Sequence, residues 1–168
     1  HIAVKALNHI KGDLASYFKT LPNIKVSVDK RDCLIIKAPS LSKKAVITND
    51  VVRLISEESF EWLGRFDHVI NSGGIKIHPE IIEKALGKFI EQRFFVAGIP
   101  DAVLGEKLVL LIEGAKDLLL ERRIMEELPL SKYERPKAFY WLASFKETGT
   151  KKIQRKATLD LIVYKSNK

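Results

Sequence analysis

The chain has 168 residues, 46% of them hydrophobic, which is enough to bury a core in one domain or in two small ones. Its single cysteine, Cys33, excludes an internal disulfide framework and favours a reducing compartment. The formal net charge of +8 admits a nucleic acid, a membrane surface or a polyanionic small molecule as partner. Because no apolar run approaches the ~20 residues of a membrane span, we expect a soluble, cytoplasmic protein.

The first residues indicate that the chain begins inside a larger protein. Its first residue is His1 rather than Met, and the alternation of Ile2, Val4 and Ala6 is typical of a strand with no start signal before it. We therefore expect a fragment.

Residues 1–63 are rich in strand-forming sequence. Alternating or β-branched runs predict strands with polar turns between them, including a turn at Asn49-Asp50. The predicted strands are Ile24–Val28, Leu34–Lys37, Ala45–Thr48, Val51–Ile55 and Phe60–Leu63. Residues 12–22 are compatible with a short helix or a packed loop. We expect an antiparallel sheet or part of a barrel.

The segment 64–83 predicts a charged turn, a β-hairpin and the start of a helix. Alternating apolar residues flank Ser72-Gly73-Gly74, and two glycines there are typical of a tight turn that needs positive φ. Pro79 fits the first position of a helix, and Glu80 fits its first turn. Apolar residues then recur at helical spacing.

The remainder of the chain predicts a compact α+β unit in which helices cover one small sheet. Strands are expected at Phe94–Ile99, Lys107–Ile112 and Phe139–Leu142. Asp117 is expected to cap one helix, and Ile153–Leu161 is expected to form the last one.

Three motifs stand in the order in which they occur in the adenylate-forming acyl-CoA synthetase family. The motifs are Thr48-Asn49-Asp50, then Gly64-Arg65-Phe66-Asp67 with Ser72-Gly73-Gly74, and finally residues 148–155, Thr-Gly-Thr-Lys-Lys-Ile-Gln-Arg. The resemblance covers essentially the whole chain. It departs from the family pattern at Ile81, where glutamate is usual, and at Lys151, where glycine is usual.

The resemblance implies an α+β fold with two parts. Residues 1–66 resemble the β-rich end of the large N-terminal adenylation domain, and residues 67–168 resemble the small α+β C-terminal lid domain. The implied parent is an acid-thiol ligase that uses a carboxylic acid, ATP and coenzyme A. Mg²⁺ would be bound mainly by the part before His1, so we expect this fragment alone to be inactive. A homo-oligomer is compatible with the sequence.

Two residues match the family's nucleotide-binding positions. Asp50 matches a ribose-binding aspartate, whose two oxygens can accept hydrogen bonds from both ribose hydroxyls. Arg65 matches an arginine that steadies ribose and phosphate oxygens with its planar fork. Without the resemblance, Asp50 is an ordinary turn residue and Arg65 is the partner of Asp67 in a surface ion pair.

Other positions match residues that act through motion of the lid domain. Asp67 matches the hinge on which the lid swings between two half-reactions. Lys152 matches the catalytic lysine, which stabilises negative charge around the α-phosphate during adenylation. Ser72, Gly73 and Gly74 match residues that line the coenzyme A tunnel. Outside this family, Lys152 is one more lysine in a basic loop, and Ser72–Gly74 is an ordinary hairpin turn.

Alternatives remain within and outside the family. Residues 60–65 and 69–74 most resemble the o-succinylbenzoate-CoA ligases of menaquinone biosynthesis, but another acyl-CoA or carrier-protein ligase is also compatible. A basic nucleic-acid-binding module is a second class, because residues 132–156 hold eight basic residues against two acidic ones. Its stacking residues would be Tyr133, Phe139, Tyr140 and Trp141. Against it, Phe139–Leu142 reads better as a core strand. The four histidines show no metal-ligand spacing, so no metal site is predicted.

Overall fold

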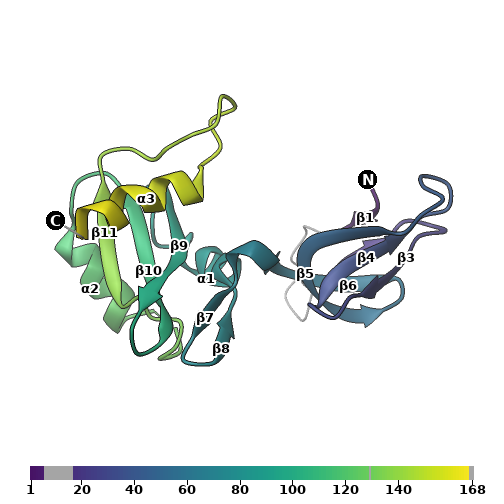
Figure 1. Cartoon of the computed structure of the whole chain (residues 1–168), viewed down its shortest axis with the longest axis horizontal. Coiled ribbons are helices and arrows are strands. Elements are labelled where there is room, and N and C mark those ends of the chain that lie inside the picture. Colours follow the sequence, from purple (N-terminus) through teal and green to yellow (C-terminus); the bar gives the residue numbers. More distant parts are fainter. Residues whose placement is uncertain (6–16, 129, 167–168) are drawn as a thin grey trace. The chain divides into compact units, whose positions relative to one another are not determined.

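The computed structural model describes residues 1–5, 17–128 and 130–166, with residues 163–166 described by their backbone alone. It divides into two compact units, His1–Val69 and Ile70–Lys168 (Figure 1). The border predicted from the motifs, between residues 66 and 67, lies just before this division. That the units are the end of an adenylation domain and a lid domain stays a prediction.

The first unit is a six-stranded antiparallel sheet in the order β1-β2-β6-β5-β4-β3. Val26, Leu34, Val52 and Phe60 form its small buried core. The predicted antiparallel arrangement is thus confirmed. The strands are β1 Ala3–Val4, β2 Phe18–Thr20, β3 Lys25–Val28, β4 Cys33–Lys37, β5 Val46–Ser56 and β6 Ser59–Arg65, followed by the 3-10 helix η1 Phe66–His68.

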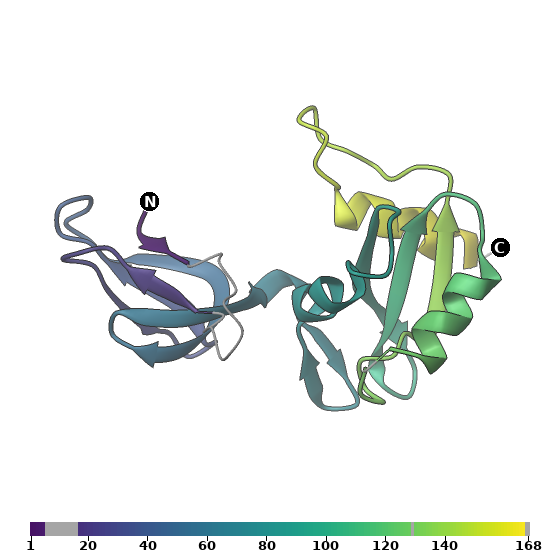
Figure 2. The same ribbon diagram turned by 180° about the vertical axis from the view of Figure 1, so that it is seen from behind.

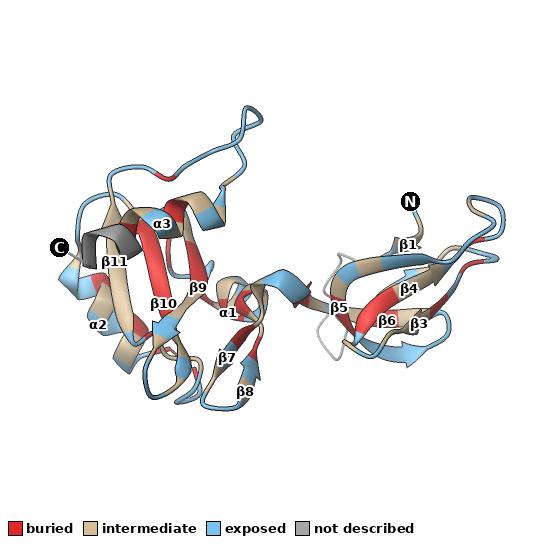
Figure 3. Ribbon diagram, viewed as in Figure 1, coloured by how far each residue is buried: buried red, intermediate tan, exposed pale blue. Residues whose placement is uncertain are grey.

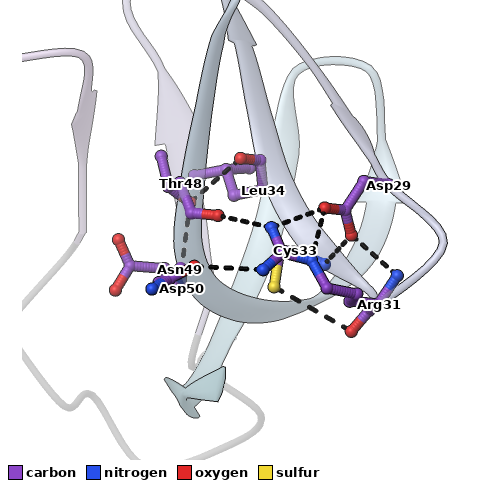
Figure 4. Close-up of polar contacts among 7 residues, drawn as sticks. All are labelled: Asp29, Arg31, Cys33, Leu34, Thr48, Asn49 and Asp50. Carbon is purple, nitrogen blue, oxygen red and sulfur yellow. Dashed lines mark hydrogen bonds and ion pairs between the residues drawn. The ribbon is translucent and has the colours of Figure 1, made fainter. Parts of the chain in front are cut away.

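The turn predicted at Asn49-Asp50 is wrong, because β5 runs through it without interruption. The pairing of β4 with β5 shifts from Cys33 opposite Val51 to Ile35 opposite Ile47, so residues 48–50 form a bulge. Within it, the Thr48 hydroxyl donates to the Leu34 carbonyl at 2.9 Å and accepts from the Asp50 backbone N–H at 3.1 Å (Figure 4). These bonds hold the bulge where the regular ladder is interrupted.

A second correction concerns residues 12–22. Phe18–Thr20 is strand β2, which pairs with β6, rather than part of a helix or packed loop. Phe18 stacks on Phe60, with ring centroids 5.4 Å apart, so a partner distant in sequence decides its conformation. Residues 12–16 of that prediction lie outside the described residues.

The second unit is a mixed sheet in the order β11-β10-β7-β8, with β9 also paired to β10. Only the β10–β11 pair is parallel; the other described pairs in this sheet are antiparallel. Its elements are β7 Ile70–Ser72, β8 Ile75–Ile77, α1 Pro79–Leu86, β9 Phe94–Asp101, β10 Gly105–Glu113, α2 Leu118–Glu126, β11 Ala138–Leu142 and α3 Arg155–Ser166.

In strand β10, residues 108–112 are all buried (Figure 3), and the strand lies inside the sheet, which Figure 2 shows from behind. On one face Leu108, Leu110 and Ile112 pack in a core that includes residues of α1 and α2. On the other face Val109 and Leu111 pack with Phe145 and with Ile162 of α3. Helices thus cover both faces, which explains the continuous apolar run at residues 108–112.

Most predicted elements of this unit are confirmed. The Asp117 carboxylate caps α2 by accepting from the backbone N–H groups of Leu119 at 2.9 Å and Leu120 at 3.0 Å. The last helix begins at Arg155 rather than Ile153, because Ile153 pairs with Glu147 in an isolated bridge. Across the described part of the chain, no helix combines the length and apolar composition needed to cross a membrane.

Candidate functional site

Three of the predicted site residues meet at one end of the first sheet. Asp50 on β5 lies directly opposite Arg65 on β6, and their side chains approach to 3.9 Å between Oδ1 and Nη1. Arg65 Nε also donates to Asp67 Oδ1 at 3.2 Å, so the surface ion pair is present as well. The side chains are 34% exposed for Asp50 and 42% for Arg65, so a ligand can reach both.

A second bulge shapes this end of the sheet. Val51 pairs with Gly64 but Val52 pairs with Trp62, which leaves Leu63 as the extra residue on β6. Gly64 takes a φ of 150°, a conformation that side-chain-bearing residues rarely adopt. The glycine before Arg65 therefore has a local structural reason.

Trp62 is a site neighbour that the sequence interpretation missed. Its indole Nε1 donates to Asp50 Oδ1 at 3.3 Å. Because a carboxylate oxygen accepts more than one hydrogen bond, Asp50 can still receive a ligand hydroxyl. The strand pairing, rather than any motif, brings this indole to Asp50.

Asp67 lies in η1, directly after β6. Burial tends to raise the pKa of its carboxyl, but hydrogen bonds from its own backbone N–H and from Arg65 outweigh burial and hold the pKa below its ordinary value. Asp67 is therefore ionised at neutral pH.

The Gly73-Gly74 turn joins β7 and β8 in a two-residue hairpin. The φ angles are 58° at Gly73 and 83° at Gly74, the pattern of a type I′ turn. The Gly73 backbone N–H donates to the Leu104 carbonyl at 2.8 Å, which ties this turn to the connection between β9 and β10. Both glycines are exposed, so their backbone is open to a ligand.

Lys152 lies in a short turn closed by the Glu147–Ile153 bridge. The Thr148 N–H donates to the Lys152 carbonyl at 2.9 Å, and the Lys152 N–H donates to the Thr148 hydroxyl at 3.1 Å. Lys152 itself is exposed. Lys151, which stands where the resembled family has glycine, takes a φ of 60°, in the left-handed region that favours glycine.

Arg155 anchors the end of this turn inside the second unit. Its guanidinium makes two parallel bonds to the Glu83 carboxylate, each 2.7 Å, and a third to the Val96 carbonyl at 3.3 Å. Glu83 also accepts from the Val96 N–H at 2.8 Å. Arg155 thus connects the Lys152 turn to α1 and β9. The sequence interpretation did not predict this pair, although Arg155 stands in the last motif and Glu83 ends the segment 64–83.

The described residues contain no group of three or more His, Cys, Asp or Glu side chains that could hold a metal ion. These residues therefore offer no complete ligand set for a metal ion, and no role below depends on one.

No protein-family model matches the chain. A 2-hydroxy-7-methoxy-5-methyl-1-naphthoate–CoA ligase from Streptomyces carzinostaticus is 31% identical over 115 residues, which are 66% of this chain and 21% of that enzyme. The crystal structure of an acyl-CoA synthetase (AMP-forming)/AMP-acid ligase II-like protein from Dyadobacter fermentans has 39% identity and a TM-score of 0.55. It matches 96% of this chain, which covers 47% of that protein.

The o-succinylbenzoate coenzyme A synthetase of Bacillus subtilis, solved with ATP and magnesium, shares the fold with a TM-score of 0.68 at 20% identity. That match covers 84% of this chain and 35% of the synthetase. The fold is thus that of a fragment of an acyl-CoA synthetase, and the likenesses support the adenylate-forming acyl-CoA synthetase family. The chain spans about a fifth of the curated relative and about half of the Dyadobacter protein.

Proposed function

We propose that the chain is the C-terminal part of an ATP-dependent acyl-CoA ligase. The observation that carries this proposal is the meeting of Asp50, Arg65 and Asp67, which come from two separate motifs and gather at one exposed end of a sheet. In the proposed reaction, a carboxylate oxygen attacks the α-phosphorus of ATP and pyrophosphate leaves. The thiol of coenzyme A then attacks the acyl carbon of the acyl-adenylate, and AMP leaves.

In the first half-reaction, Asp50 would accept hydrogen bonds from the ribose hydroxyls while Arg65 donates to nucleotide oxygens. The exposed Lys152 ammonium would stabilise the negative charge that concentrates between the attacking carboxylate and the α-phosphate. The hydrogen bonds within residues 148–152 already hold the backbone of this turn. Less conformational freedom would therefore be lost when Lys152 contacts the α-phosphate.

In the second half-reaction, the exposed backbone at Gly73 and Gly74 would lie along the pantetheine arm of coenzyme A. Glycine lets a ligand approach the backbone closely. Asp67 lies just before the division between the two units. It would be the hinge on which the lid domain turns between the two half-reactions.

The identity of the carboxylic acid substrate is a more specific part of the proposal. Residues 60–65 and 69–74 resemble o-succinylbenzoate-CoA ligases, and the Bacillus subtilis enzyme of that name shares the fold. The Streptomyces relative is named for a naphthoate, which is also an aromatic carboxylate. Assaying the intact parent protein with ATP, coenzyme A and a panel of acids tests this choice against other acyl-CoA ligases and, with a carrier protein as acceptor, against carrier-protein ligases.

The role of Lys152 can be tested with the substitution Lys152→Ala in the intact parent protein. We expect adenylation, followed as acid-dependent pyrophosphate exchange, to fall on the order of 100-fold, because a group that stabilises transition-state charge is removed. Thioester formation from a supplied acyl-adenylate should be unchanged. Lys156→Ala is the matched control, because Lys156 is also exposed and lies close in sequence on α3. Equal loss of both half-reactions would contradict the assignment.

The nucleic-acid alternative draws less support from the packing. Phe139 and Trp141 of β11 pack against one core of the second unit and Tyr140 against the other. These three are therefore poorly placed to stack on bases, whereas Tyr133 is exposed. A gel shift with single-stranded nucleic acid at increasing salt separates the two proposals.

A further inference from the structure

Arg31 lies beside the candidate nucleotide site without being part of any motif. It stands in the connection between β3 and β4, and its guanidinium contacts three segments of the first unit, two of which are drawn in Figure 4. One contact is with its own turn, one is with the bulge of β5, and one is with η1. These last two segments carry Asp50 and Asp67.

Asp29 fixes the direction in which Arg31 points. Its Oδ2 accepts from Arg31 Nε at 2.9 Å and lies 2.8 Å from Nη2, while its Oδ1 accepts from the backbone N–H groups of Arg31 at 2.7 Å and Cys33 at 3.0 Å. Burial tends to raise the pKa of Asp29, but these hydrogen bonds and the Arg31 charge together lower it. The carboxylate stays ionised, and the fork of Arg31 is held in place.

The two Nη atoms of the Arg31 guanidinium also donate hydrogen bonds to the bulge at residues 48–50. Nη1 donates to Asn49 Oδ1 at 3.2 Å, and Nη2 donates to the Thr48 carbonyl at 3.4 Å. Both acceptors belong to the residues immediately before Asp50. Since a bulge interrupts the regular ladder, these bonds supply partners that the neighbouring strand does not.

The same guanidinium also lies over the ring of Phe66, which belongs to the motif that contains Arg65. Its central carbon lies 5.0 Å from the centre of the Phe66 ring, within the range of a cation–π contact. Phe66 is the residue between Arg65 and Asp67. One planar side chain therefore touches the bulge that contains Asp50 and the ring between the other two site residues.

We propose that Arg31 is a positioning residue for the nucleotide site, a role that rests on the proposed ligase function. Braced by Asp29, it sets the spacing between the Thr48-Asn49-Asp50 bulge and the Arg65-Phe66-Asp67 segment, and it does not itself contact the nucleotide. A lysine cannot replace it, because an ammonium has neither the planar fork nor the flat face that these contacts use together.

The first test compares Arg31→Met, Arg31→Lys and Arg53→Met in the intact parent protein. Arg53 is the matched control, because it is an exposed arginine of β5 that pairs with Glu61. We expect both Arg31 variants to raise the KM for ATP roughly 10-fold while the KM for coenzyme A stays constant, because misplaced binding groups weaken nucleotide contacts selectively. Arg53→Met should change neither constant. Full activity in Arg31→Lys, or equal changes in both KM values, would overturn the proposal.

The second test does not depend on catalysis. In the chain described here, Arg31→Met should shift the backbone amide resonances of Asn49, Asp50 and Phe66 in NMR spectra, and Arg53→Met should leave them in place. Unchanged resonances in Arg31→Met would overturn the positioning role even in an active ligase. If the intact parent shows no pyrophosphate exchange with any acid, the ligase function fails, and the nucleotide role of Arg31 fails with it.

Discussion

Arg155 shows how a single residue of the last motif acts within the fold. Its two bonds to Glu83 have the parallel geometry in which arginine matches a carboxylate, and the side chains are only 24% and 17% exposed. The pair joins the residue that begins α3 to α1. Its position three residues after Lys152 makes it the fixed end of the lysine turn.

We therefore expect Arg155→Met to lower the free energy of unfolding by about 2 kcal/mol, because Glu83 would keep its partial burial and lose its charged partner. Urea denaturation of the chain measures this change. Arg123→Met is the control, since Arg123 is an exposed arginine whose pair with Glu127 spans 3.8 Å. The control should lose less than about 0.5 kcal/mol. Equal losses in the two variants would show that the Glu83 pair adds nothing.

Among the elements, the β7–β8 hairpin depends most directly on its turn residues. Both glycines have positive φ, and a Cβ at Gly74 would meet no atom within 4 Å. Any cost of a substitution at Gly74 therefore comes from the backbone conformation rather than from a clash.

Gly74→Ala should cost about 1–2 kcal/mol of unfolding free energy, the usual cost of a left-handed conformation for an L-residue. Gly74→Asn should cost less, because asparagine tolerates this region. Gly149→Ala is the matched control, since Gly149 is exposed, lacks positive φ and also has open space around it. Denaturation curves that show no difference between Gly74→Ala and Gly149→Ala would contradict this expectation.

Elements fixed by local chemistry were predictable from the sequence. The glycine turn of the hairpin, the start of α1 at Pro79 and the Asp117 cap each depend on residues a few positions apart. Elements fixed by distant partners were not. The bulge at residues 48–50 depends on β4, and strand β2 depends on β6, so neither could be read from its own segment.

The candidate site likewise combines residues that a motif predicts with residues that distant contacts bring together. The motifs predicted Asp50 and Arg65 as nucleotide-binding residues, and the strand register places them opposite each other. The contacts of Trp62 with Asp50 and of Arg31 with Asn49 were not predicted, because they depend on strand pairing and side-chain packing rather than on a motif.

For the molecule as a whole, the chain covers only part of the length of each relative, and this leads to an expectation about its activity. The chain corresponds to about half of the Dyadobacter protein and a fifth of the Streptomyces ligase. We therefore expect the chain by itself to show no acid-dependent exchange of pyrophosphate into ATP, whereas the intact parent should show it. The measurement is radiolabelled exchange with the same panel of acids. Exchange by the chain alone would mean that the groups assigned to the rest of the parent are dispensable.

Strand β10 has a consequence for how the second unit can work. The Gly73 backbone N–H is hydrogen-bonded to the loop that enters β10. Helix α3, which follows the turn that contains Lys152, packs against one face of the same strand. Both turns are thus attached to the same strand of the second unit. Under the proposed function, the second unit would therefore turn as a whole to bring first Lys152 and then the Gly73–Gly74 backbone to the ligand.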